Sequence, residues 1–293
     1  MLCFCSILFF RMGTGAQGNR GTGAQGKGEP EKRRRSSDSP ERTECRMKDL
    51  YIRKISLIDS PPKESYLNRL PVVKHLAEHG IDFHKQVTFF VGENGSGKST
   101  LIEALAVSQG FNPEGGTKNF RFSTEDSHSG LYYHLRVARG VVYPRDGFFL
   151  RAESFYNVAS NIDQMDREPG GGAPVIMNYG GVSLHKQSHG ESFLALAENR
   201  FGGRGLYILD EPEAALSPRG IIRLMRRMDE LVKQDSQFII STHSPMLLAF
   251  PDAEVYRIGQ DGIRSVRFQD TDHYRTTVRF LQNPESAIED ILG

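Results

Sequence analysis

Apolar residues follow two different patterns in the body of the chain. Residues 50–57 (LYIRKISL) alternate apolar and polar positions, which predicts a strand buried on one face. Residues 86–91 (QVTFFV), 206–209 (LYIL) and 237–242 (QFIIST) are continuous apolar runs of strand length. Such runs are typical of strands buried on both faces, as in a parallel sheet. The three runs therefore predict the centre of a sheet.

Helical segments alternate with these buried strands. One extends from Lys98 to about Ser108 after the first strand, one from about His189 to Asn199 before the second, and one from Pro218 to Lys233 between the second and the third. Strands that alternate with helices predict an α/β fold with a mainly parallel sheet. The segment that begins at His189 predicts a short helical subdomain within this fold.

Other parts of the body suggest antiparallel strands. Residues 131–137 (LYYHLRV) and 148–153 (FFLRAE) are separated by turn-forming residues, and we expect residues 120–153 to form an antiparallel β appendage. Two short strands flank Asp261-Gly262, a good hairpin turn, and short helices close the chain. The body has no internal repeat, so it is expected to hold one copy of its domain.

The N-terminal stretch differs from the body. Residues 1–47 contain nine Lys/Arg and five Asp/Glu, and the hexapeptide GTGAQG occurs at 13–18 and again at 21–26. Such a glycine-rich, charged segment cannot bury a core, so we expect 1–47 to be a disordered basic tail and 48–293 the folded domain. The run Lys32–Arg35 is either an address for the nucleus or nucleic acid or, more simply, a solvated charge run. We also expect Met47 to be the natural start, with 1–46 a translated leader.

Composition narrows the class of protein. The chain has 293 residues and a net charge of +1, so the tail at +4 leaves the body at −3 and without a strong footprint for nucleic acid. All three cysteines lie in the tail, which fits a reducing cytosol and predicts a cytoplasmic protein. No stretch reaches 18 apolar residues, so direct membrane insertion is not expected.

The strongest motif follows the strand at 86–91. Residues 92–99 (GENGSGKS) match G-x-x-x-x-G-K-[ST] completely, and a helix follows. In such a loop backbone N–H groups turn towards phosphate oxygens, Lys98 reaches the β- and γ-phosphates, and the Ser99 hydroxyl ligates Mg²⁺. The expected nucleotide-binding residues here are Gly92, Glu93, Asn94, Gly95, Ser96, Gly97, Lys98, Ser99 and Thr100.

A second motif ends the strand at 206–209. Asp210 and Glu211 follow it directly, and Pro212 ends it. Asp210 is expected to act on the Mg²⁺ through a bound water. Glu211 would point towards the γ-phosphate, where it could orient or deprotonate the attacking water. A strand that ends in two acids is weak evidence alone, but the phosphate-binding loop upstream favours the functional interpretation.

Taken together, the motifs resemble those of the ABC ATPase superfamily. The acidic pair lies within LDEPEAALS at 209–217, the signature motif S-x-G-[QE] resembles Ser188-His189-Gly190-Glu191, and the switch histidine resembles His243 in ISTHS. Ser188 precedes Asp210 by 22 residues, as is usual in the family. The resemblance extends from about Leu50 to the C-terminus.

The resemblance implies a composite site in a dimer. Ser188, Gly190 and Glu191 would bind the γ-phosphate of ATP held by the other copy of the chain, so that each nucleotide lies between two chains. Lys98, Glu211 and His243 are then the catalytic residues. The metal ligands are Ser99, Asp210 and Glu153, where Glu153 in Arg151-Ala152-Glu153-Ser154 takes the place of the family's glutamine. ATP and Mg²⁺ are the expected cofactors.

Several residues depart from the family pattern. Ser217 stands where many transporter subunits have Asp, and no glutamine occupies the glutamine loop. An aromatic that stacks on adenine should precede the phosphate-binding loop; Tyr66 is a candidate, but it is equally well a surface tyrosine.

The sequence leaves two roles open. The motif sequences LDEPEAALSP and STHSP favour a soluble ATPase like the small bacterial predicted ATPases related to the RecF, Rad50 and SMC branch. Some proteins of that branch act in DNA repair. Only 88 residues separate Ser99 from Ser188, so no long coiled coil fits between them. The alternative is the nucleotide-binding subunit of a membrane transporter, with a permease as partner. A nucleotide-gated module without catalysis is disfavoured because Glu211 is present.

Overall fold

The computed structural model describes residues 49–118, 129–167 and 174–292. The tail predicted over residues 1–47 lies outside these described residues. The domain boundary at 48 and the start at Met47 therefore stay predictions.

The centre of the fold is a six-stranded sheet. Its strands are, in spatial order, β5 (Asp146–Arg151), β6 (Gly205–Asp210), β7 (Gln237–Ser241), β3 (Val87–Gly92), β8 (Glu254–Gly259) and β9 (Gly262–Val266). The first five are parallel, and β9 turns back on β8 through the predicted hairpin at Asp261-Gly262. The mainly parallel α/β fold predicted from the sequence is confirmed.

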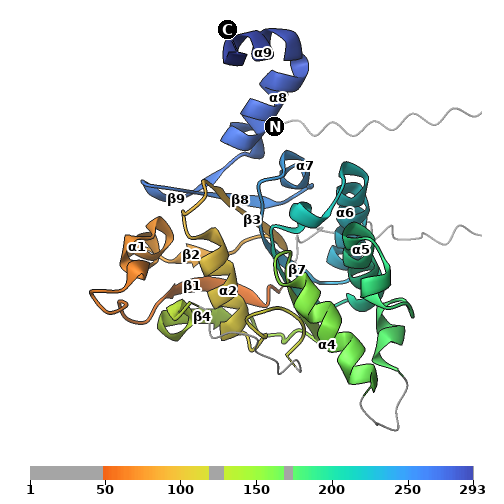
Figure 1. Cartoon of the computed structure of the whole chain (residues 1–293). Helices are drawn as coiled ribbons and strands as arrows, with labels where there is room; N and C mark the ends of the chain where they lie inside the picture. Colours follow the sequence, from red (N-terminus) through yellow and green to blue (C-terminus); the bar gives the residue numbers. More distant parts are fainter. Residues whose placement is uncertain (1–48, 119–128, 168–173, 293) are drawn as a thin grey trace, which may run out of the picture. The chain divides into compact units, whose positions relative to one another are not determined.

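The central strands bury both faces, as their continuous apolar runs predict. Phe89 and Phe90 are adjacent on β3, and neither is exposed. Phe89 packs into the core that also holds residues of α4 (Phe155–Arg167), α5 (His189–Arg200) and α6 (Pro218–Val232). Phe90 points to the opposite face, into the core formed with α2 (Lys98–Ser108). Helices thus cover both faces of the sheet (Figure 1).

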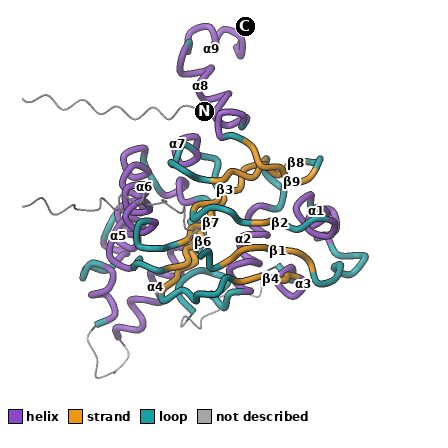
Figure 2. The backbone as a smooth tube through the Cα atoms, turned by 180° about the vertical axis from the view of Figure 1, so that it is seen from behind, coloured by secondary structure: helices purple, strands orange, loops and turns teal. Residues whose placement is uncertain are grey.

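A second, antiparallel sheet lies on the α2 side, as Figure 2 shows from behind. It consists of β2 (Ile81–Asp82), β1 (Ile52–Leu57) and β4 (Leu135–Arg139), and it shares the core of α2. The remaining α-helices are α1 (Pro71–Glu78), α3 (Leu131–His134), α7 (Pro245–Leu248), α8 (Asp272–Gln282) and α9 (Pro284–Leu292). Short 3₁₀ turns lie at Tyr66–Arg69, Val175–Tyr179, Leu184–Lys186, Pro212–Ala215 and Phe268–Asp270.

The expected antiparallel appendage is only partly correct. The sequence predicted strands at 131–137 and 148–153, but residues 131–134 form α3, and the second run is β5 of the central parallel sheet. Phe148, Phe149 and Leu150 are all buried, which is the pattern of a strand covered on both faces rather than of a hairpin. The antiparallel sheet that does exist pairs β4 with β1.

Within the described ranges, no helix combines the length and the apolar character that crossing a membrane would require.

Candidate functional site

The phosphate-binding loop joins β3 to α2, as its sequence predicts. Gly97 has φ 94°, in the left-handed region, and a Cβ on it would lie 2.5 Å from Val72 Cγ1, so only glycine fits there. Lys98 begins α2 and is 4% exposed. Its Nζ donates to the backbone oxygens of Gly92 at 2.8 Å and Glu93 at 3.0 Å. The Lys98 ammonium is thus hydrogen-bonded to the backbone of its own loop.

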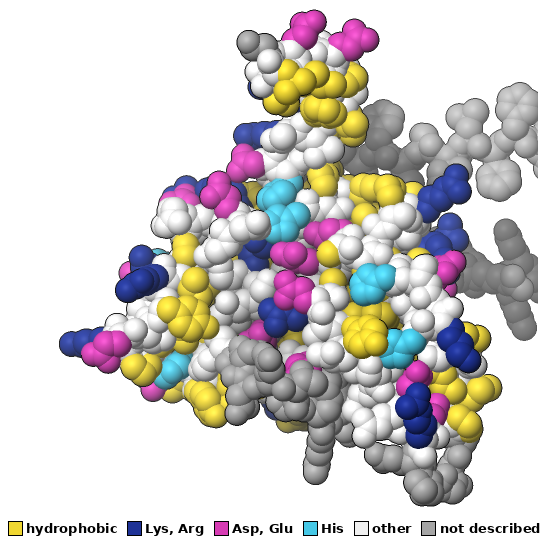
Figure 3. Space-filling view, viewed as in Figure 1, with side chains coloured by type: hydrophobic (Ala, Val, Ile, Leu, Met, Phe, Trp, Pro, Cys, Tyr) yellow, Lys and Arg dark blue, Asp and Glu magenta, His cyan; other side chains and the backbone are white. Residues whose placement is uncertain are grey.

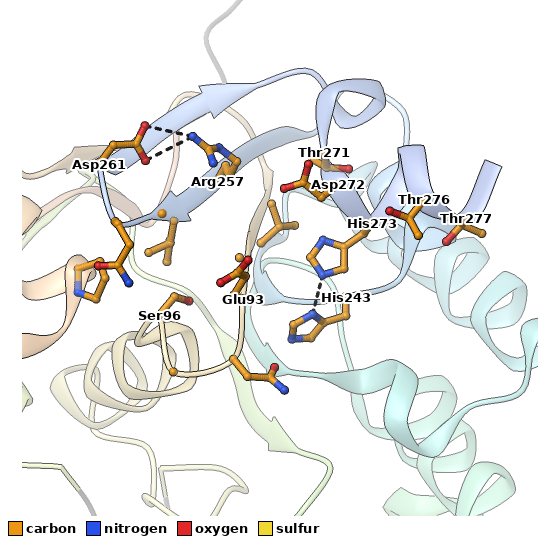
Figure 4. Close-up of a pocket in the computed structure, with 18 residues that line it drawn as sticks. Glu93, Ser96, His243, Arg257, Asp261, Thr271, Asp272, His273, Thr276 and Thr277 are labelled. Atoms are coloured by element: carbon orange, nitrogen blue, oxygen red, sulfur yellow. Dashed lines mark hydrogen bonds and ion pairs between the residues drawn. The ribbon is translucent and has the colours of Figure 1, made fainter. Parts of the chain in front are cut away.

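A cavity of about 740 Å³ opens above this loop. Its walls are the backbone from Gly92 to Ser96, the β8–β9 hairpin, His243 and the first turns of α8 (Figure 4). The Ser96 hydroxyl is buried and has no hydrogen-bond partner among the described residues. A loop of backbone amides with an unpaired hydroxyl and a lysine fits a polyanionic ligand such as a nucleotide phosphate chain.

A row of polar side chains crosses the carboxyl ends of three neighbouring strands. In the sheet register Arg151 of β5 lies opposite Asp210 of β6, which in turn lies opposite Ser241 of β7. The Ser241 hydroxyl donates to Asp210 Oδ1, and Arg151 Nε donates to Asp210 Oδ2 at 3.1 Å. Asp210 is only 4% exposed, and its two oxygens are paired with the buried Ser241 and the partly buried Arg151.

Arg151 also reaches the helix of the phosphate-binding loop. Its Nη1 donates to Glu103 Oε2 of α2 at 2.8 Å. The two carboxylates raise the pKa of Arg151 although burial opposes this. One guanidinium therefore joins the acidic strand end to α2 and forms an ion pair with each carboxylate.

Glu211 follows Asp210 directly and has an unusual backbone conformation. Its φ is 48°, in the left-handed region that is uncommon for residues other than glycine, and its N–H donates to Ser241. The conformation carries the side chain out of the strand, where it is 38% exposed and its Oε1 lies 3.3 Å from His243 Nε2. Burial and the neighbouring Asp210 raise the pKa of Glu211, and Lys98 opposes them.

His243 follows β7 and lies beside Glu211. Glu213 accepts a hydrogen bond from the His243 backbone N–H, which fixes the chain at this point. Burial, with further contributions from Lys98 and His273, lowers the pKa of His243 to about 4. Its imidazole is therefore neutral near pH 7.

A second histidine touches the first. His273, on the first turn of α8, points down at His243, and its Nε2 lies 2.8 Å from His243 Nδ1 (Figure 4). Burial and Lys98 lower the pKa of His273 as well. Figure 3 shows histidine side chains next to acidic ones below the C-terminal helices on this face of the molecule.

The predicted signature motif forms the start of α5. Ser188 is the N-cap, its Oγ accepts the N–H of Glu191 at 3.4 Å, and the Glu191 carboxylate returns to the Ser188 N–H at 3.3 Å. This capping box leaves Ser188 and Glu191 exposed. Neither these two nor Gly190 lines the cavity above the phosphate-binding loop.

Three weaker candidates lie apart from that cavity. The Glu153 side chain is 87% exposed, and its nearest charged partner is Arg151 Nε at 3.9 Å. Tyr66 is 57% exposed on a 3₁₀ turn before α1. Ser217, the departure from the usual Asp, is the N-cap of α6, where its Oγ accepts the Gly220 N–H at 3.2 Å.

The sequence reasoning missed the roles of several residues around these motifs. Arg151, Glu103 and Ser241 contact Asp210 or its partner, and His273 contacts His243. A signal existed for Arg151 and Ser241, because both end apolar runs and the carboxyl ends of parallel strands meet at one edge. No local pattern marks His273.

Two family models match parts of the chain. One is described as an AAA domain and matches residues 72–136; the other is described as an AAA domain, putative AbiEii toxin, Type IV TA system, and matches residues 191–249. The first covers the phosphate-binding loop, and the second covers Asp210, Glu211 and His243.

Solved structures of known cassettes resemble the chain at low sequence identity. The protein cbiO1 of Clostridium perfringens, part of an ABC transporter complex, is 14% identical and matches 83% of this chain and 99% of its own, with a TM-score of 0.46. The SMC head domain of Thermotoga maritima is 17% identical and matches 74% of this chain and 99% of its own, with a TM-score of 0.38.

Two named relatives are more similar in sequence. The cytochrome c biogenesis ATP-binding export protein CcmA of Aliivibrio fischeri is 26% identical over 58% of this chain and 84% of that protein. A putative ABC transporter ATP-binding protein of Methanothermobacter marburgensis is 30% identical over 61% of this chain and 69% of its own length. Because this likeness extends over the ATP-binding cassette itself, the chain belongs to the ABC-type ATPase family, as a single cassette.

Proposed function

We propose that the chain binds ATP with Mg²⁺ and hydrolyses it to ADP and phosphate as a dimer that encloses the nucleotide. The proposal rests on three residues that converge from different elements: Lys98 at the start of α2, Glu211 after β6, and His243 in the wall of the cavity, while the signature residues lie elsewhere on the same chain.

The residues at the cavity fit a triphosphate. Gly95 and Gly97 have the left-handed φ that lets such a loop curl around a phosphate, and the buried Ser96 hydroxyl is unpaired within the described residues. Burial lowers the pKa of the Lys98 ammonium, although the carboxylates of Glu211, Asp210 and Glu213 favour its charge. A phosphate chain would replace the Gly92 and Glu93 carbonyls as the partner of Lys98 and would satisfy the Ser96 hydroxyl.

The residues also fit Mg²⁺. Mg²⁺ in proteins is commonly held by a hydroxyl and one or two carboxylates together with the phosphates of its substrate, and Ser99 and Asp210 supply such oxygen donors. When bound, the ion would neutralise charge on the β- and γ-phosphates. Glu153 is a weaker candidate because its side chain is almost fully exposed.

Glu211 and His243 would handle the attacking water. The raised pKa of Glu211 makes its carboxylate a stronger base than an ordinary glutamate, which suits a group that orients or deprotonates water. His243 is neutral, so it can donate one N–H to a γ-phosphate oxygen without adding charge.

The dimer is supported by what the cavity lacks. Ser188 is exposed and Gly190 is partly exposed at a helix start suited to phosphate, and neither lines the cavity beside their own chain's loop. In the proposed dimer α5 of a second copy completes the γ-phosphate site, so that Ser188, Gly190 and Glu191 act across the dimer.

The Glu211→Gln variant tests this proposal. It should bind ATP, hydrolyse it poorly and accumulate as a dimer in gel filtration with ATP. The double variant Lys98→Ala/Glu211→Gln is the matched control: at an ATP concentration that just saturates Glu211→Gln it should stay monomeric, because loss of Lys98 weakens binding of the nucleotide that joins the chains. An ATP-loaded Glu211→Gln protein that remains monomeric would refute the dimer.

Two partners are candidates for the process that hydrolysis drives. The names of the relatives favour a membrane permease, since one is an export protein and another a putative transporter ATP-binding protein. A DNA-associated role like that of the RecF and SMC branch rests only on the sequences of the motifs LDEPEAALSP and STHSP. Co-purification of a multispanning membrane protein with the ATP-bound Glu211→Gln variant would support the first, and stimulation of the ATPase by DNA would support the second.

A further inference from the structure

His273 is a residue outside every ABC-type motif that touches the proposed switch histidine. It lies 30 positions after His243, on the first turn of α8, and the two rings are 4.8 Å apart between centroids with an angle of 62° between their planes. The contact joins His273 Nε2 to His243 Nδ1 at 2.8 Å, a hydrogen-bond distance.

The start of α8 is fixed locally by a buried N-cap and two ion pairs. Thr271, the N-cap, is 1% exposed, and its hydroxyl donates to the Phe268 carbonyl at 2.6 Å. Asp270 pairs with Arg267 at 2.8 Å and with Arg275 at 2.8 Å, one on either side of the cap. These contacts hold the helix start independently of His273.

A proton count follows from this geometry. Two neutral imidazoles carry one N–H each, and one proton must lie between the two nitrogens that meet. If His243 donates from Nδ1, its Nε2 carries a lone pair. That lone pair then faces the carboxylate oxygen Glu211 Oε1 at 3.3 Å, and the two repel each other. If His273 donates from Nε2, His243 carries its proton at Nε2 and donates it towards Glu211.

With Glu211 ionised, only the second arrangement satisfies both contacts. We propose that His273 is a positioning residue: its Nε2–H donates to His243 Nδ1 and thereby holds His243 in the tautomer whose Nε2–H points to Glu211 and to the γ-phosphate position. The lowered pKa of both rings is consistent with the neutral forms that this needs. The consequence for hydrolysis rests on the proposed function, but the tautomer itself does not.

Nitrogen-15 spectra of histidine-labelled protein test the tautomer directly. Long-range proton–nitrogen correlations distinguish a protonated ring nitrogen from one with a lone pair, and His243→Gln identifies the signals by their loss. In the nucleotide-free wild type we expect His243 to be protonated at Nε2 and bare at Nδ1. In His273→Phe the preference should fall to a mixture, whereas His273→Gln, whose amide N–H can donate, should retain it.

His79→Phe is the matched control, because His79 is an exposed histidine on the far end of α1, and it should leave the His243 signals unchanged. Protonation of His243 at Nδ1 in the wild type, or an unchanged His243 tautomer in His273→Phe, would overturn the proposal.

Steady-state kinetics supply a second, separate readout. Loss of a partner that orients a functional histidine typically lowers activity about 10- to 100-fold. His273→Phe should therefore lower kcat roughly tenfold with little change in KM, and His273→Gln should restore most of the lost kcat. A wild-type chain without ATPase activity but with the expected spectra would refute the proposed function and leave the tautomer standing. Activity with the wrong tautomer would refute only the inference.

Discussion

Arg151 and Asp210 lie opposite each other at the carboxyl ends of neighbouring parallel strands, and the Arg151 Nε is 3.1 Å from the Asp210 Oδ2. The same guanidinium donates to Glu103 at 2.8 Å, so one cation serves two carboxylates that are almost fully buried. The expected metal ligand Asp210 is thus neutralised by a side chain of its own sheet.

Loss of Arg151 should therefore be costly for stability. Arg151→Met keeps most of the apolar stem but leaves the buried Asp210 and Glu103 without their counter-ion, and the breaking of a buried pair typically costs about 3 kcal/mol or more. Urea unfolding measures the loss. Arg223→Met is the control, because the Arg223–Glu198 pair is largely exposed and should contribute less than about 1 kcal/mol.

The same variant probes the proposed metal site. With the guanidinium gone, millimolar Mg²⁺ should raise the free energy of unfolding of Arg151→Met more than that of the wild type, because the ion no longer competes with Arg151 for Asp210. An equal response of the two proteins would argue against Asp210 as a metal ligand.

Lys98 should decide nucleotide affinity. Hydrogen bonds to charged groups contribute about 1.5–3 kcal/mol, so Lys98→Ala should weaken ATP binding on the order of 100-fold. Isothermal titration calorimetry with Mg²⁺-ATP measures the change. Lys54→Ala removes an exposed lysine that pairs with Asp82, and it should bind ATP like the wild type. Undiminished affinity in Lys98→Ala would contradict the phosphate assignment.

Acid should destabilise the protein through His243. Its pKa is about 4 when folded and 6.5 in the reference state, so between these values only the unfolded chain binds the proton. The contribution of neutral His243 to the free energy of unfolding is complete above pH 6.5 and is lost as the pH falls towards 4. The loss reaches about 2 kcal/mol near pH 5. Urea unfolding at the two ends of this range should show a flatter pH dependence for His243→Gln than for the wild type, and the wild-type slope for His79→Gln.

The sequence predicted the parts of the site that local patterns encode. Lys98 lies in a contiguous motif, and Asp210 follows an apolar run, so both could be placed before the fold was known. The pairing of Arg151 with Asp210 could not be predicted, because the two are 59 residues apart and the sequence pattern at 148–153 predicts an antiparallel strand where the parallel strand β5 forms. His273 reaches the site only because α8 packs beside the strand ends, which depends on tertiary contacts and leaves no periodic signal.

Complementation between two inactive variants separates a site within one chain from a site between two. Lys98→Ala spoils the phosphate-binding loop, and Ser188→Arg places a bulky charge at the exposed start of α5. Each homodimer should be nearly inactive. In a mixed dimer one site combines both defects, but the other pairs an intact loop with an intact signature, so mixing the two proteins should restore ATPase activity. A site built within one chain would stay inactive on mixing, because every chain carries a defect.

The measurement is the rate of phosphate release as a function of mixing ratio, with a maximum expected at equal amounts. A mixture of Lys98→Ala with Lys98→Ala/Ser188→Arg is the control, since it contains no intact loop and should remain inactive at every ratio.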